Sequence, residues 1–149
     1  MATNMKTIKF GENGEVYAVN APAVSVSGEL TESAQEIDFG TFDGLTEAVV
    51  VVRGVADTPG DYTILNINGT DVRFVTSAGA YKSVLCVTFK KIGSLWSTHW
   101  FSADAGYKME WTGNFYDSFE SLESITSLKV KAYSGTPFAA GTKYALEGR

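Results

Sequence analysis

The sequence predicts an all-β protein: an antiparallel β-sandwich, jelly-roll-like, with an N-terminal hairpin or arm. Runs in which apolar and polar residues alternate recur about every ten residues, the spacing of short strands. The chain has 15 glycines against 3 prolines, and aromatic residues make up 13% of it, which suits short strands joined by tight turns. Only residues 115–125 ("FYDSFESLESI") resemble a helix, and they fit a capping loop equally well.

The N-terminal third predicts a hairpin followed by an irregular segment. In residues 6–19 ("KTIKFGENGEVYAV") the pair Asn13-Gly14 accepts the positive φ that tight hairpin turns need. Residues 20–35 are mostly small or polar and fit either a linker or an edge segment of a sheet. We therefore predict an N-terminal attachment arm at residues 1–34 and a sandwich domain at residues 35–149.

The remaining strands follow in order, with two informative details. Asn68-Gly69 predicts a second tight hairpin. The unbroken run Val49, Val50, Val51 and Val52 is typical of a strand covered on both faces. The predicted strands are residues 36–42, 47–54, 62–67, 70–75, 82–91, 93–103, 107–113, 125–133 and 142–148.

Charge and cysteine content narrow the classes of partner. With 12 basic and 17 acidic residues the formal charge is −5, and no basic run exists, so nucleic acid is not an expected partner. No segment of about 18 apolar residues exists, so we expect no membrane insertion. We expect the chain to be made in a cytoplasm, because its start has no apolar signal segment. The single cysteine, Cys86, cannot form an internal disulfide and is expected to be a buried, inert thiol.

The residue types that carry chemistry form no recognisable catalytic pattern. His99 is the only histidine; no G-x-S-x-G nucleophile motif accompanies it, and neither a second histidine nor a second cysteine is present to complete a metal site. The carboxylates are scattered, with no calcium-loop spacing, and phosphate-binding glycine motifs are absent. We predict no enzyme activity, no catalytic residue, no metal and no cofactor.

An aromatic cluster between residues 96 and 119 has two interpretations. Exposed rings stack on sugars or on partner proteins, whereas the same rings turned inward belong to the core. The alternation of Tyr107, Met109 and Trp111 with charged residues favours an ordinary inward face. The candidate contacts with a glycan or a partner are Trp96, Trp100, Tyr107, Trp111 and Tyr116.

The two ends of the chain resemble those of bacteriophage virion proteins. The C-terminal stretch "ITSLKVKAYSGTPFAAGTKYALEGR" is similar to the end of small β-sandwich domains on tail fibres, tail tips and head fibres. In that pattern Glu147 stands where an aromatic residue is usual. The opening "MKTIKFGENGEVYAV" looks like the start of fibre or head-decoration proteins. The matching C-terminal residues are Ile125, Leu128, Phe138, Ala139, Ala140, Gly141, Thr142, Leu146 and Gly148.

This resemblance implies a non-enzymatic virion structural protein: a head fibre, a decoration protein or a tail-fibre component. Its N-terminal arm would dock onto capsid or tail proteins, and its sandwich would face outward toward the host surface, where a glycan is a candidate partner. The resemblance also implies a homotrimer. Phe138 is expected to plug the last loop into the core, while Gly141 opens the last strand without a side-chain clash. The alternative is a carbohydrate-binding module that uses Trp96, Trp100 or Trp111 as its platform.

Overall fold

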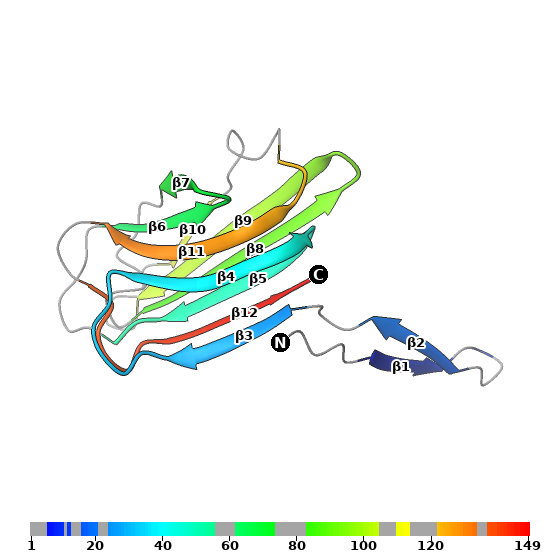
Figure 1. The fold of residues 1–149 in the computed structure, drawn as a ribbon, viewed down its shortest axis with the longest axis horizontal. Coiled ribbons are helices and arrows are strands. Elements are labelled where there is room, and N and C mark those ends of the chain that lie inside the picture. The colour runs from blue at the N-terminus through cyan, green and yellow to red at the C-terminus, as the bar shows by residue number, and fades with distance from the viewer. Residues whose placement is uncertain are drawn as a thin grey trace.

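The protein folds into two antiparallel sheets packed against each other, with a separate two-stranded hairpin (Figure 1). The computed structural model describes residues 6–10, 12, 16–20, 24–55, 62–73, 83–104, 110–113, 122–133 and 137–149, and these residues form no helix. The predicted all-β class and antiparallel β-sandwich are confirmed. The strands are β1 (Lys6–Phe10), β2 (Val16–Asn20), β3 (Val24–Glu29), β4 (Glu36–Leu45), β5 (Glu47–Arg53), β6 (Tyr62–Ile67), β7 (Thr70–Arg73), β8 (Ser83–Ile92), β9 (Leu95–Asp104), β10 (Glu110–Gly113), β11 (Ile125–Tyr133) and β12 (Lys143–Gly148).

The sandwich has one six-stranded sheet, in the order β10-β9-β8-β5-β12-β3, and one four-stranded sheet, in the order β4-β11-β6-β7. The side chains of Ala48, Val50 and Val52 on β5, and of Ile37 and Phe39 on β4, point into the space between the sheets, as the pleat of a strand dictates. The buried core is Ile37, Phe39, Leu45, Ala48, Val50, Val52, Leu65, Ile67, Leu85, Val87, Phe89, Ile125, Leu128, Val130, Phe138 and Leu146. Burial of each larger side chain contributes about 1.5–3 kcal/mol, so this interior is the main source of stability.

The N-terminal hairpin is confirmed as a pairing of β1 with β2, in which Phe10 lies opposite Val16. Figure 1 shows it extending beyond one end of the sandwich. Asn13-Gly14 lies outside the described residues. Residues 24–29 take the edge-strand alternative: β3 pairs with β12 along its whole length, and the described part of the sandwich therefore begins at Val24. The division of the chain into arm and sandwich stays a prediction, with β3 on the sandwich side.

Two glycine bulges bend β4, which forms one edge of the four-stranded sheet. Asp38 pairs with Lys129 and Thr41 pairs with Ser127, so one extra residue lies on β4 between them. Gly40 occupies that position with φ +94°, a conformation that favours glycine, and its N–H donates to Asp38 Oδ1 over 2.8 Å. A second irregularity precedes Leu45, where Gly44 has φ +100°. An irregular edge of this kind resists pairing with another strand.

The last strand lies inside the larger sheet rather than at its edge. β12 pairs with β3 on one side and with β5 on the other. Before it, Phe138 is fully buried, as expected. Gly141 was expected to avoid a clash, but a Cβ there would lie 3.5 Å from Val55 Cγ2, an ordinary contact, and glycine is favoured instead by its φ of +89°. Beyond it, Arg149 N–H donates to Glu47 O, and the N–H groups of Thr46 and Glu47 donate to Arg149 O, each over 2.9 Å. The chain end is therefore held by main-chain hydrogen bonds.

One prediction was wrong for the described residues, because they cover β5 on one face only. Val50 and Val52 are fully buried, but Val49 is 39% exposed and Val51 is partly exposed. An apolar run predicts two covering layers, and among the described residues only the four-stranded sheet supplies one. Of the segment with a helix-like pattern, residues 122–124 are not helical, Ile125 begins β11, and residues 115–121 lie outside the described part of the chain.

Candidate interaction surface

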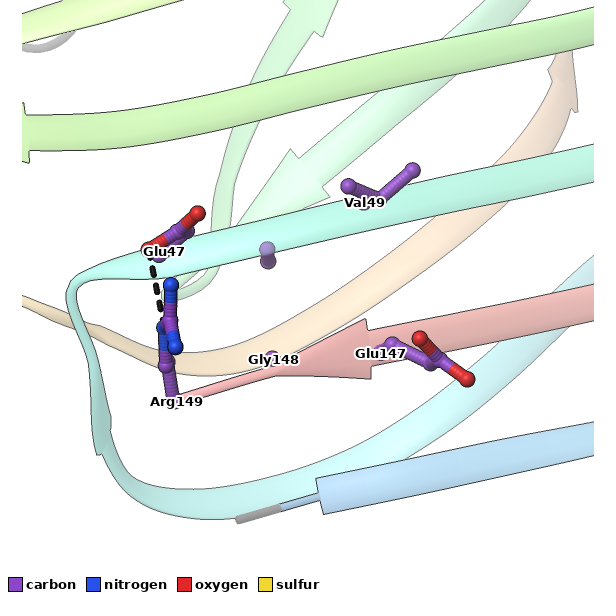
Figure 2. A pocket seen from close by; sticks show the side chains of 6 residues that line it. Glu47, Val49, Glu147, Gly148 and Arg149 are labelled. Carbon is purple, nitrogen blue, oxygen red and sulfur yellow. Dashed lines mark hydrogen bonds and ion pairs between the residues drawn. The ribbon is translucent and has the colours of Figure 1, made fainter. Parts of the chain in front are cut away.

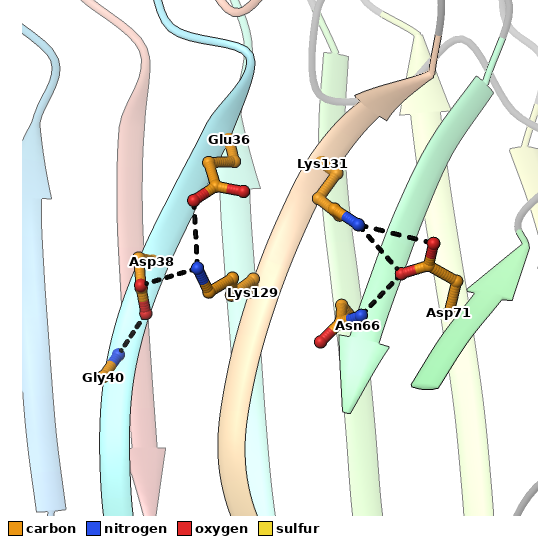
Figure 3. Close-up of polar contacts among 7 residues, drawn as sticks. All are labelled: Glu36, Asp38, Gly40, Asn66, Asp71, Lys129 and Lys131. Atoms are coloured by element: carbon orange, nitrogen blue, oxygen red, sulfur yellow. Dashed lines mark hydrogen bonds and ion pairs between the residues drawn. The ribbon is translucent and has the colours of Figure 1, made fainter. Parts of the chain in front are cut away.

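The two outer faces of the sandwich differ in character, and the outer face of the four-stranded sheet is charged. Lys129 on β11 lies between Glu36 and Asp38 of β4, with its Nζ 3.0 Å from an oxygen of each (Figure 3). Lys131 Nζ lies 3.0 Å from Asp71 Oδ1. Lys129 therefore has its carboxylate partners on the adjacent strand β4, whereas the partner of Lys131 lies on β7, beyond β6 in the same sheet. Exposed pairs of this kind stabilise the fold modestly.

The pKa directions fit this arrangement. The Gly40 N–H, and after it Lys129, hold the pKa of Asp38 below its usual value. A hydrogen bond from Asn66, and after it one from Lys131, lowers the pKa of Asp71 (Figure 3). These charges are satisfied within the sheet, so we do not select this face as a binding site.

The outer face of the six-stranded sheet is apolar by comparison. Its strand register aligns five outward-pointing side chains into one row across β3, β12, β5, β8 and β9. None of the five is charged, and four of them are half-buried. They stay partly exposed because no layer of described residues covers this face. The row is Ser27, Ala145, Val51, Cys86 and Phe101. The adjacent row is Ser25, Glu147, Val49, Thr88 and His99.

Two further apolar residues extend this face at the β8–β9 turn. Ile92 and Leu95 lie opposite each other in register and are 62% and 73% exposed. By the two-residue alternation of their strands they share the outward side with Thr88 and His99. We call the two rows together with Ile92 and Leu95 the open face. Three of the four large hydrophobic residues that are exposed in the described part of the chain, Val49, Ile92 and Leu95, belong to it.

Ion pairs border the open face at both ends of the strands. At one end Lys143 Nζ lies 3.7 Å from Glu29 Oε2. At the other end Arg149 Nε donates to Glu47 Oε2 over 2.9 Å, and this bond is the main cause that lowers the pKa of Glu47. Lys90 Nζ lies 4.0 Å from the same carboxylate. An apolar centre with a charged rim is the usual anatomy of a protein interface.

A shallow depression of about 230 Å³ lies at the second of these ends (Figure 2). Figure 2 shows the Glu47–Arg149 pair, with Val49 further along β5 and Glu147 on β12. The depression is open and small compared with most ligand pockets, which span about 300–1,000 Å³. It is lined by Glu47, Ala48, Val49, Glu147, Gly148 and Arg149.

Two of the three tryptophans that the sequence selected, Trp96 and Trp100, lie on the inward side of β9. Trp96 and Trp100 are half-buried and pack against the core. The Nε1–H of Trp96 donates to Leu122 O over 2.6 Å, and Lys91 Nζ lies 5.8 Å from the centre of its ring. The side chain of Trp111 on β10, and Tyr107 and Tyr116 altogether, lie outside the described residues.

The remaining candidates for chemistry are side chains of the open face. His99 is exposed and lies opposite Thr88. Cys86 is half-buried, and desolvation raises the pKa of its thiol, which keeps it protonated at neutral pH. Among the described residues, no group of three or more His, Cys, Asp or Glu side chains is arranged to hold a metal ion.

Sequence reasoning missed the open face, although two signals for it were present. The four-valine run indicated a second covering layer, and Ile92 and Leu95 flank the Gly93-Ser94 turn, a place where large apolar residues are unusual.

The chain matches no protein-family model and no curated protein. The described residues contain no helix with the length and hydrophobicity needed to cross a bilayer.

Proposed function

We propose that this chain is a non-enzymatic structural protein of a bacteriophage virion: a head fibre, a decoration protein or a tail-fibre component. The N-terminal hairpin attaches to capsid or tail proteins, and the sandwich contacts other copies of the chain and the host surface. A homotrimer, virion localisation and the absence of catalysis belong to the same proposal. The observation that supports an assembly role best is the open face, because a contiguous apolar surface with a charged rim suits protein contact.

The terminal residues that carry the resemblance have structural roles that fit this proposal. Phe138 and Leu146 are fully buried, and Gly148 contacts Leu45 so closely that a Cβ on it would lie 2.7 Å from Leu45 Cδ1. In a closing strand these residues specify a compact end for the sandwich. The hairpin at the opposite end of the chain remains available for attachment (Figure 1).

The carbohydrate-binding alternative receives less support. A sugar platform needs an exposed aromatic face, and both Trp96 and Trp100 direct part of their surface to the core. Phe101 on the open face is also half-buried. We therefore keep glycan contact as a secondary role of the virion protein.

Purified particles of the encoding phage test the proposal. Mass spectrometry of virions banded on a density gradient should find this chain at a constant ratio to the major capsid protein. Deletion of residues 1–20 should abolish that incorporation while the truncated chain stays folded and accumulates in the lysate. Absence of the full-length chain from banded virions would refute the proposal.

A further inference from the structure

We infer that the open face is a contact between copies of this chain, so that a second copy supplies the covering layer that β5 lacks. The inference rests on the proposed function for its setting, but it follows from the described residues and is tested separately. The resemblance implies that copies of the chain associate, but it does not specify the surface through which they do so.

The sequence of β5 and the exposure of its side chains disagree. The sequence of this strand is apolar at four consecutive positions, the pattern of a strand buried on both sides. The chain itself buries Val50 and Val52 completely and leaves Val49 39% exposed. A second layer of protein over Val49 and Val51 removes the discrepancy between this pattern and the single chain.

The register of the strands places the apolar side chains of the open face next to one another. Because Val51 pairs with Cys86 on one side and with Ala145 on the other, the apolar side chains adjoin one another across neighbouring strands. Phe101 continues the row on β9. The first row is therefore free of charged side chains, and Glu147 is the one carboxylate of the second row. Sheets pack face to face at about 10 Å.

The area of this sheet face is sufficient for a stable contact. Five strands about 4.8 Å apart and seven residues rising about 3.4 Å each give a face of roughly 600 Å² per copy. Stable interfaces bury about 600–1,000 Å² per partner, so the face is large enough, and the protruding Ile92 and Leu95 add to it.

The charge of the open face and its rim favours an identical partner over a strongly acidic or strongly basic one. The rim and the rows carry four cations and three carboxylates, a net of +1, although the whole chain carries −5. Both ends of the face have both signs, so a second copy brings an opposite charge for each. The charged residues are Arg53, Lys90, Lys143, Arg149, Glu29, Glu47 and Glu147.

Sedimentation velocity and light scattering on the full chain test this inference. The wild type should sediment as an oligomer, and Val49→Lys should reduce the measured mass to that of one chain, because a buried lysine opposes docking. Ile92→Ser combined with Leu95→Ser should weaken association at least tenfold; both residues are so exposed that the fold does not depend on them. The matched control is Thr41→Lys, which places the same charge on the opposite outer face and should keep the wild-type mass.

A monomeric wild type at high micromolar concentration would overturn the inference, as would a double variant that retains the wild-type mass and affinity. Circular dichroism of each variant establishes that it is folded. These outcomes are independent of virion incorporation: a chain that oligomerises through this face but is missing from particles would refute the proposed function alone.

Discussion

Ala34 and Phe138 exchange a pair of backbone hydrogen bonds. The Ala34 N–H donates to Phe138 O over 2.9 Å, and the Phe138 N–H donates to Ala34 O over 2.8 Å. This bridge ties the segment that follows β3 to the loop that precedes β12. Because the Phe138 ring is also fully buried, the loop is fixed through both its main chain and its side chain.

Replacing Phe138 by alanine should therefore destabilise the sandwich strongly. Loss of a buried ring and the cavity left behind typically cost about 3–5 kcal/mol. Urea denaturation should show this loss, and Phe138→Leu should recover part of it. Ala140→Ser, at an exposed position of the same loop, should stay within about 0.5 kcal/mol of the wild type. A Phe138→Ala loss below about 1 kcal/mol would show that the ring does not anchor the loop.

Gly148→Ala should destabilise through crowding. A Cβ at this position would lie 2.7 Å from Leu45 Cδ1 and 3.0 Å from Glu47 O, so β12 or the β4–β5 corner would have to shift. Overpacking of this kind costs about 1–3 kcal/mol. Thermal unfolding should detect it, with Asp43→Ala, at an exposed position of β4 outside the open face, as the nearly neutral control. Equal stability of the two variants would mean that the corner is loosely packed.

The side chain of Asn68 should stabilise the fold in addition to the effect of its backbone on the β6–β7 turn. It has φ +51°, its Nδ2 donates to Ser124 O over 2.8 Å, and its Oδ1 accepts from Thr126 N over 2.7 Å. Asn68→Gly keeps the backbone freedom and loses the side-chain bonds, whereas Asn68→Ala loses both. We expect losses of about 1–2 kcal/mol for glycine and about 1 kcal/mol more for alanine, measured by urea denaturation. No loss in Asn68→Gly would show that the side-chain bonds do not contribute, and a larger loss for glycine than for alanine would show that the positive φ does not.

Asp38 and Lys129 should give a pH-dependent contribution to stability. The pKa of Asp38 is lowered by folding, so its contribution is present above the unfolded value near 3.9 and is lost as pH falls through the folded pKa. The pKa of Lys129 is raised, first by Asp38, so its contribution is lost as pH rises through the folded pKa, above about 10.4.

The free energy of unfolding should therefore differ most between the wild type and Asp38→Asn at about pH 5–9, and the difference should shrink toward pH 2. Glu32→Gln, in the exposed segment after β3, controls for general charge effects. A difference that grows on acidification would contradict the assigned direction of the Asp38 pKa.

Cys86 should react slowly with a thiol reagent. Desolvation raises its pKa, so little thiolate is present near neutral pH. Ellman's reagent at pH 8 should label the folded chain at least tenfold more slowly than the chain in urea. In the Val49→Lys variant the rate should rise, because Val49 and Cys86 share the open face. Equal rates for folded and unfolded wild type would contradict the placement.

Sequence reasoning succeeded where local chemistry decides the structure. Asn68-Gly69 specified the β6–β7 turn, and both residues have positive φ. Alternation along residues 125–133 identified the inward Leu128 and Val130, which are fully buried. The reason is that turn geometry and the two-residue period are properties of the segment itself.

It failed where the outcome depends on distant segments. The bulge at Gly40 exists because β4 must stay in register with β11, about ninety residues away, and no local pattern encodes that pairing. The indole N–H of Trp96 donates to the carbonyl group of Leu122, 26 residues further along the chain, and no local pattern predicts that contact. The valine run of β5 predicted two covering layers where the described residues supply one, because the covering of a strand depends on distant segments and not on its own sequence.

Electron microscopy of particles from a phage in which this gene is deleted tests the central claim most directly. A virion structural role predicts that these particles lack a fibre, knob or surface density that the wild type shows, and that supplying the intact chain restores it. Deleted particles that match the wild type in every resolved feature would contradict that role.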